Sequence, residues 1–218
     1  MDPYTNNYVL AVHTECESSL EAASPSQHAR SLSPQVQQAS PSPIGLAWLD
    51  LSTGQFFTQS VTLSMLPSVI SRIGPSEIVL EEGLQIAKEH ALFSTLEDES
   101  HLITYSPSVT ASSVMEWSPM LESKVSTDVA AMFTVEEVAA GSLLLHFVKT
   151  RLQGLSMKLQ PPLRYQALET MAIDKSTMKA LEIKETLRDS LFRGSLIHAV
   201  RRTVTKGGAR LLTEWLGM

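Results

Sequence analysis

The sequence predicts an α+β fold, in which a sheet covered by helices is followed by a wholly helical stretch. Up to about residue 105, short segments rich in strand-forming residues alternate with segments of helical periodicity. Beyond residue 130, apolar residues recur at spacings of three and four, as in amphipathic helices. The 218 residues, of which 43% are hydrophobic, suffice for a buried core in one large domain or two small ones.

The first half is predicted to form a sheet with helices packed on it. The segment 44–51 is almost continuously apolar, as expected of a central strand covered on both faces, and a turn from Asp50 to Gly54 follows it. Helices are predicted over 64–73, where a Gly-Pro pair stops the helix, and over 84–97. In chain order, the predicted strands are residues 8–12, 44–51, 55–61, 76–80 and 101–105.

The second half is predicted to begin after a loop-rich crossing at residues 106–130 and to be helical. Thr134 and Glu137 form a capping box, in which each side chain accepts a backbone N–H of the other residue, at the start of a helix that ends near residue 154. Asp174 and Thr205 are the predicted N-caps of later helices. We therefore divide the chain into domains at residues 1–130 and 131–218.

Residues 17–43 differ in composition from the rest of the first half. They contain eight Ser, four Pro and four Gln and few bulky apolar residues. Such a segment cannot bury enough apolar surface to offset the entropy lost on ordering. We expect a disordered insertion here.

Charge is distributed unevenly along the chain. The net charge is −6, but residues 1–173 hold 8 Lys and Arg against 18 Asp and Glu, and residues 174–218 hold 9 against 5. A basic end of this size fits either phosphate contacts or an ordinary solvated helical surface. No apolar run approaches the roughly 20 residues that span a bilayer, so no membrane partner is expected. A single cysteine, Cys16, excludes a disulfide framework within the chain.

No catalytic, cofactor-binding or metal-binding residue is predicted. Asp50 is one acid at a strand end, whereas two-metal cleavage needs several converging carboxylates, so its expected role is to cap the next turn. The six histidines lack metal-ligand spacing, and no G-x-x-x-x-G-K-[ST] phosphate-binding sequence is present. Gly207 and Gly208, at the start of the last helix, are interpreted as a place where a neighbouring backbone comes close.

The first half resembles the connector domain of MutS mismatch-repair proteins. The resemblance rests on Asn6-Asn7-Tyr8, on GLAWLDLSTG at residues 45–54, and on Ile73, Pro75 and Glu77. It implies an RNase H-like fold for this part. The insertion at residues 17–43 departs from the compact bacterial pattern and falls in the loop between the first two strands.

Three motifs of the second half resemble the start of the MutS core and lever domain, in the family's order and spacing. The resemblance implies an incomplete all-α domain, in which the matching residues have structural roles. The first motif contains Asp174, Thr177, Leu181 and Glu182, the second is the Gly-Ser-Leu motif of Gly194, Ser195 and Leu196, and the third contains Thr205, Gly208, Arg210 and Trp215.

Whole MutS proteins also contain a mismatch-reading domain, a clamp and a dimeric ATPase, and this chain resembles none of these. The resemblance thus implies part of an ATP-dependent mismatch-repair protein, a segment that relays conformational changes and docks partners without binding ATP or Mg²⁺ itself. The implied partners of the whole protein are mismatched double-stranded DNA, a second MutS-type subunit and a MutL-type protein.

Two other functions fit the same residues. One is a free-standing adaptor or remnant that binds repair partners, and the other is a fragment of an RNase H-like nuclease. Within the family, residues 132–154 and 158–166 are most similar to the fungal mitochondrial branch. That similarity implies a mitochondrial location, with a nuclear location as the alternative.

Overall fold

The computed structural model describes residues 7–14, 42–86, 91–96, 101–109, 113–152, 158–165 and 173–217. Cys16 and all but the last two residues of the insertion predicted at 17–43 lie outside the described residues. So does most of the sequence between residues 165 and 173, for which an extended segment is expected.

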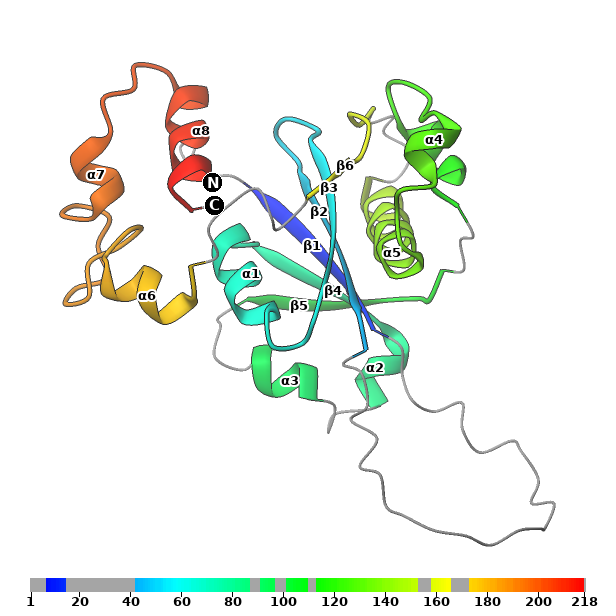
Figure 1. The fold of residues 1–218 in the computed structure, drawn as a ribbon, viewed down its shortest axis with the longest axis horizontal. Helices are drawn as coiled ribbons and strands as arrows, with labels where there is room; N and C mark the ends of the chain where they lie inside the picture. Colours follow the sequence, from blue (N-terminus) through cyan, green and yellow to red (C-terminus); the bar gives the residue numbers. More distant parts are fainter. Residues whose placement is uncertain are drawn as a thin grey trace, which may run out of the picture.

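A six-stranded mixed sheet forms the centre of the fold, with strand order β5-β4-β1-β2-β3-β6 (Figure 1). β1, β2 and β3 are antiparallel neighbours, whereas β4 pairs parallel to β1, β5 parallel to β4, and β6 parallel to β3. The predicted mixture of strands and helices is confirmed, and each of the five predicted strands agrees with the structure to within one residue. The strands are β1 (Tyr8–His13), β2 (Ile44–Asp50), β3 (Phe56–Val61), β4 (Glu77–Glu81), β5 (Leu102–Ser106) and β6 (Leu163–Arg164).

The central strand β2 is buried along its whole length, as its apolar sequence predicts. Because successive side chains point to opposite faces of a sheet, Leu46 and Trp48 enter one core, and Ala47 and Leu49 enter another. The sheet therefore separates two apolar clusters, each of which needs its own cover of helices.

Three short helices cover the face that holds Leu46 and Trp48: α1 (Leu66–Ile73), α2 (Glu82–Ile86) and α3 (Ala91–Leu96). Pro67 lies in the first turn of α1, where its missing N–H costs nothing. Gly74 ends α1 and donates its N–H to the carbonyl of Ile70 at 2.7 Å. A single helix is expected over residues 84–97. Its described residues lie in α2 and α3, and residues 87–90 and 97 lie outside the described residues.

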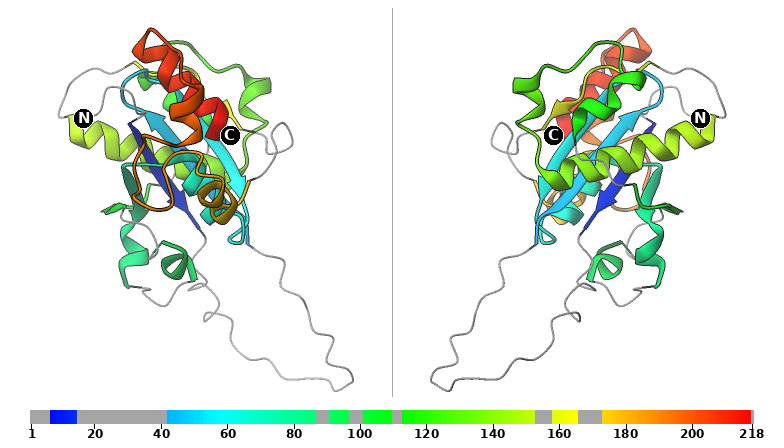
Figure 2. Two further views of the ribbon diagram at one scale, coloured as in Figure 1. Left: turned by 90° about the vertical axis from the view of Figure 1, so that its left-hand side faces the viewer. Right: turned by 90° about the vertical axis from the view of Figure 1, so that its right-hand side faces the viewer.

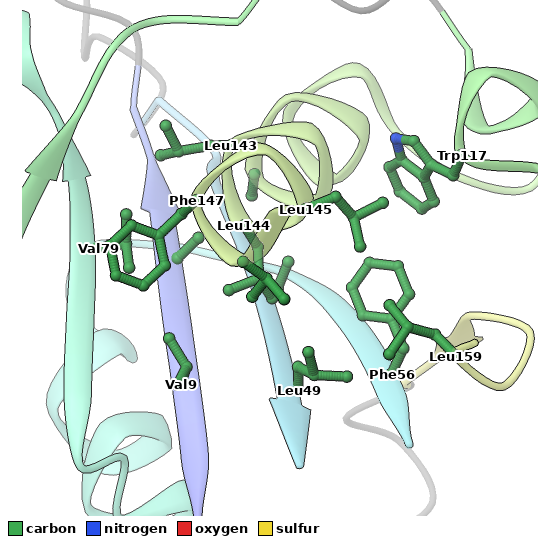
Figure 3. Packing of buried hydrophobic residues seen from close by; sticks show 14 of the residues in the cluster. Val9, Leu49, Phe56, Val79, Trp117, Leu143, Leu144, Leu145, Phe147 and Leu159 are labelled. Atoms are coloured by element: carbon green, nitrogen blue, oxygen red, sulfur yellow. The ribbon is translucent and has the colours of Figure 1, made fainter. Parts of the chain in front are cut away.

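The long helix α5 (Val135–Leu152) covers the opposite face and packs across β1, β2 and β3 (Figure 3). The predicted capping box is confirmed. Thr134 donates its N–H to Oε2 of Glu137 at 2.8 Å, and Glu137 donates its N–H to Oγ1 of Thr134 at 3.3 Å. Leu143 and Leu144 are fully buried against the sheet.

The outer side of α5 is covered by residues for which a loop-rich crossing is predicted. They include the 3₁₀ helix η1 (Val114–Met120) and the short α4 (Thr127–Ala130). The indole N–H of Trp117 donates to Oγ of Ser142 at 2.8 Å, and its ring packs against Phe56. α5 is therefore enclosed nearly all round, which explains why its buried residues are not confined to one stripe.

α5 and β6 pack with the sheet, so the sheet unit continues past residue 130, where a domain boundary is expected from the sequence. The boundary expected from sequence came from a change to helical periodicity, but a helix that follows a sheet can still belong to it. The change of structural unit comes between β6 and α6 (Lys175–Ala180).

Residues 173–217 form a smaller all-helical unit with α6, α7 (Leu196–Val200) and α8 (Lys206–Gly217). Its core consists of Met178, Ile183 and Ile197, with Ile173 and Leu216 packed against them. Figures 1 and 2 show these helices on the α1 side of the sheet, away from α5. No helix among the residues described above is long and apolar enough to cross a membrane.

β6 is held to α5 by a buried ion pair. Nε of Arg164 lies 3.0 Å from Oε2 and 3.1 Å from Oε1 of Glu137. The Glu137 side chain is completely buried, whereas that of Arg164 remains 34% exposed. The same carboxylate thus serves the capping box of α5 and the last strand of the sheet.

We predict that Gly45→Ala destabilises the protein by about 1–3 kcal/mol, the usual cost of overpacking a core. A Cβ at Gly45 would overlap the backbone carbonyl of Glu136, so α5 would have to move off the sheet. The change in the free energy of unfolding is measured by urea denaturation. Gly83→Ala is the control, because no atom lies within 4 Å of its added Cβ. Equal stability of both variants would contradict the close packing of α5.

We predict that Glu137→Ala costs about 3 kcal/mol of folding free energy, the lower end of the range for breaking a buried ion pair, because Arg164 keeps some solvent. The matched control is Glu136→Ala, whose side chain has no ion pair with a described residue. A loss below about 1 kcal/mol, the range of surface ion pairs, would show that the pair does not hold β6.

Candidate functional site

Asp50 is the acid that the sequence predicts at the end of a strand, and the structure shows its role. Asp50 is buried, and its carboxylate accepts the N–H of Ser52 at 2.7 Å and the hydroxyl of Thr53 at 3.1 Å. Its predicted role as the cap of the following turn is confirmed. No group of three or more His, Cys, Asp or Glu side chains lies close enough to hold a metal ion in the described part of the chain.

Two residues of the first motif, Asp174 and Thr177, form the N-cap of α6. Asp174 accepts the backbone N–H of Thr177 at 2.9 Å and its hydroxyl at 2.6 Å. Hydrogen bonds from the side chains of Ser176 and Thr177 hold the pKa of Asp174 well below its usual range. The capping role predicted for Asp174 is thus confirmed.

The Gly-Ser-Leu motif forms the start of α7 and joins it to the turn after α6. Ser195 is fully buried, donates its hydroxyl to the carbonyl of Phe192 at 2.8 Å and accepts the N–H of His198 at 3.2 Å. Gly194 has φ +107°, a conformation that favours glycine. Leu196 donates its N–H to the carbonyl of Glu182 at 2.9 Å.

The third motif forms the start of α8, but its glycines do not have the predicted role. Oγ1 of Thr205 accepts the N–H of Gly208 at 3.0 Å, which confirms the N-cap. Among the described residues, no atom outside the helix's own backbone lies within 4 Å of a Cβ added at Gly207, and the atoms nearest to one at Gly208 belong to the side chains of Thr205 and Thr203. The expected close approach of another backbone is therefore wrong, and nothing in the structure explains Gly207.

The remaining motif residues lie at or near the surface of this unit. Leu181 and Trp215 are 59% and 65% exposed, and Leu196 is also exposed. Arg210 is half-buried and has no hydrogen bond or ion pair with a described residue. The motif residues thus comprise helix caps and exposed side chains, and they do not converge on one chemical site.

A different set of residues comes together where the helical unit meets the sheet. Nζ of Lys184, in the segment after α6, donates to the carbonyls of Ser71 at 2.7 Å and Arg72 at 3.0 Å. These carbonyls belong to the last turn of α1. Carbonyl groups in the last turn of a helix have no N–H partner within the helix, and they form the negative end of the helix dipole. One ammonium group thus ties residues 173–217 to the sheet unit.

A pocket of about 240 Å³ lies at this junction, and we call it the junction pocket. Within it, Arg72 stacks over the Tyr165 ring at 4.0 Å from the centroid and donates to Oε1 of Gln59 at 2.8 Å. Burial lowers the pKa of Arg72, partly opposed by Tyr165. The residues lining the pocket are Tyr8, Trp48, Phe57, Arg72, Ile73, Gly74 and Tyr165 from the sheet unit and Lys184, Thr213 and Glu214 from the helical unit.

Glu214 brings a carboxyl group from α8 to the junction pocket. Burial raises the pKa of Glu214, and the nearby charge of Asp50 raises it further. The side chain has no hydrogen bond or cationic partner among the described residues. The junction therefore combines aromatic walls, two cations that already have partners, and one carboxyl group that lacks one.

Sequence reasoning did not single out Lys184, Arg72 or Glu214. The partners of Lys184 are backbone carbonyls more than a hundred residues earlier in the chain, and no spacing of side chains reports such a contact. A lysine just after a helix and a glutamate within one are common on solvated surfaces, so only the tertiary arrangement distinguishes them.

Comparison with known proteins gives two family matches that meet near this junction. Residues 31–168 match the family model of MutS domain II, and residues 176–218 match that of MutS domain III. The first match includes α5 and β6 and ends before α6, in agreement with the boundary that packing indicates.

Curated relatives support the same conclusion. The chain is 34% identical over 175 residues to "DNA mismatch repair protein MutS" of Rhodopseudomonas palustris (strain BisA53), a match that covers 79% of this chain and 19% of the relative. It is 30% identical over 186 residues to the protein of that name from Synechocystis sp. (strain ATCC 27184 / PCC 6803 / Kazusa), covering 79% of this chain and 21% of the relative. The chain thus spans about a fifth of the length of the curated relatives that it matches. The match to the model of MutS domain II over more than half of the chain, together with relatives at 30–34% identity over 79% of it, shows that the chain belongs to the MutS family.

Proposed function

We propose that this chain acts in DNA mismatch repair as a mechanical segment that relays conformational change between the parts of a MutS-type protein. The observation that supports this role most directly is the contact of Lys184 with the carbonyl end of α1. This contact joins the unit that matches domain II to the unit that matches domain III through a charged side chain.

The form of this contact suits a relay. The Lys184 ammonium group contacts the end of α1 beside a pocket of about 240 Å³, so the described part of the junction is incompletely packed. Small interfaces between domains permit relative motion, whereas large apolar ones do not. The Lys184 contact would therefore open and close, while the sheet unit, with α5 buried on it, would move as one body.

The remaining attributes of this proposal rest on resemblance to the family. They include the RNase H-like fold of the sheet unit and the role of lever for the helical unit. The whole protein would bind mismatched DNA, pair with a second MutS-type subunit, recruit a MutL-type protein and use ATP with Mg²⁺. A mitochondrial location is proposed from the similarity of residues 132–154 to the fungal mitochondrial branch.

We predict that purified protein comprising residues 1–218 does not hydrolyse ATP. The physical reason is that the sequence contains no phosphate-binding loop of the G-x-x-x-x-G-K-[ST] type. Phosphate release is measured with and without Mg²⁺ and a mismatched DNA duplex. Hydrolysis of several ATP molecules per protein molecule, by an activity that copurifies with the protein, would contradict the proposal of a non-catalytic relay.

We predict that Lys184→Met raises the spontaneous mutation rate several-fold when introduced into the gene that encodes this chain. The methionine keeps the length of the side chain but cannot donate to the carbonyls of Ser71 and Arg72, so the two units lose their link. Mutation rate is measured by fluctuation analysis, and immunoblotting checks that the amount of protein is unchanged.

The matched control for this prediction is Lys179→Met, which removes an exposed lysine of α6 in the same unit. A relay at the junction requires that only the Lys184 variant raises the mutation rate. Equal rates in both variants and the parent would exclude the Lys184 contact as the relay.

A further inference from the structure

The junction pocket contains one charged side chain, Glu214, that has no partner among the described residues. Its two cations are engaged, since Arg72 contacts Gln59 and Tyr165, and Lys184 contacts the carbonyl end of α1. Thr213 donates its hydroxyl to the carbonyl of Ala209 at 3.0 Å within α8. Among these lining groups, the Glu214 carboxyl is the one charged group without a described partner.

A second acid, Asp50, acts on Glu214, and its negative charge raises the pKa of Glu214. A cation beside Glu214 would offset this repulsion. Arg210 lies one helical turn before Glu214 on α8, at a spacing that permits an ion pair, but the structure contains no such pair. The cation that would complement Glu214 is thus missing from the described residues around it.

The aromatic walls of the pocket favour one class of cation, the guanidinium group. Trp48 and Phe57 stack with ring centroids 5.4 Å apart, and Trp48 also meets Tyr165 at 6.1 Å. A planar guanidinium is more weakly hydrated than an ammonium and stacks on aromatic rings. Arg72 above Tyr165 shows that this wall already accommodates one guanidinium in that manner.

The volume of the pocket limits the size of its ligand. At about 240 Å³ it lies below the roughly 300–1,000 Å³ that is usual for sites of drug-sized molecules. A nucleotide is therefore too large, whereas the end of one long side chain fits.

We propose that the junction pocket binds an alkylguanidinium group, such as the end of an arginine side chain, with the Glu214 carboxylate as its charged partner and the Trp48 ring as its wall. Because Glu214 comes from α8 and Trp48 from β2, the ligand contacts both units at once. Binding would therefore favour the arrangement in which the two units are in contact. The site lies at the proposed relay, but the binding of a guanidinium group does not require that the relay exists.

The test is a titration of the ¹⁵N-labelled chain with ethylguanidinium chloride, followed by the indole N–H resonance of Trp48. Trp48→Phe identifies that resonance, and ethylurea, a neutral compound of similar shape, is the control ligand. We expect a saturable shift with a dissociation constant on the order of 1 mM for ethylguanidinium, as for a ligand of few atoms. Ethylurea should give no saturable shift at tenfold higher concentration.

Variants then identify the charged partner. Glu214→Gln should weaken ethylguanidinium binding at least tenfold, and Glu185→Gln, which removes a nearby exposed carboxylate outside the pocket, should change it less than twofold. Arg210→Gln should leave binding unchanged or strengthen it. Free arginine and a short arginine peptide, compared in the same titration, distinguish a metabolite from a partner protein as the source of the group.

Three results would overturn the proposal: no saturable shift with ethylguanidinium, equal binding of ethylurea, or unchanged binding by Glu214→Gln. The comparison of the two ligands needs no variant, so it decides the question even if Glu214→Gln disturbs α8. The amide resonances of α8 show whether such a disturbance occurs.

Discussion

The close approach of α5 to the sheet is the constraint on which the rest of the structure depends. Gly45 on β2 and Gly141 on α5 leave no room for a side chain, since an added Cβ would overlap the backbone of Glu136 or the ring of Trp117. This approach lets Leu143 and Leu144 bury one face of the sheet completely. The opposite face is then left for α1, whose end receives Lys184.

The contrast between the two packing interfaces explains how one chain can be both rigid and movable. α5 contacts four strands of the sheet and is enclosed by η1, so separating it would expose a large apolar cluster. The buried cluster of the helical unit consists of three residues, and this unit meets the sheet unit at the junction pocket. In the proposed relay, a conformational change would therefore cost least free energy at the junction.

Local patterns in the sequence were sufficient to predict the strands and the helix caps. Apolar segments bounded by Gly, Pro and Asp gave five strands, and the caps at Thr134, Asp174 and Thr205 depend on residues only three positions apart. β6 was missed because two residues after a Pro-Pro pair carry no periodicity. The packing of α5 on the sheet could not be predicted, because a change from strands to a helix does not reveal which unit buries that helix.

The contacts at the junction could not be predicted either, because they depend on the tertiary structure and not on a local pattern of side chains. Lys184 binds backbone carbonyls, which every residue possesses, so no side-chain pattern identifies its partner. Glu214 differs from an ordinary surface glutamate only because α8 brings it near Asp50 and the aromatic walls. In contrast, the family motifs identify residues that define helix ends, and these residues preserve the fold of the helical unit.

The central claim is that the contact between the two units opens and closes. The most direct measurement is the distance between spin labels on α1 and on the helical unit in the intact MutS-type protein. Met65→Cys, at the residue before α1, and Leu187→Cys provide exposed positions. Cys16→Ser removes the single thiol of residues 1–218, and any further cysteine of the intact protein is replaced as well. We predict two distances whose proportions change with the bound nucleotide and shift toward the longer one in Lys184→Met. One distance that changes with neither the nucleotide nor Lys184→Met would contradict the account.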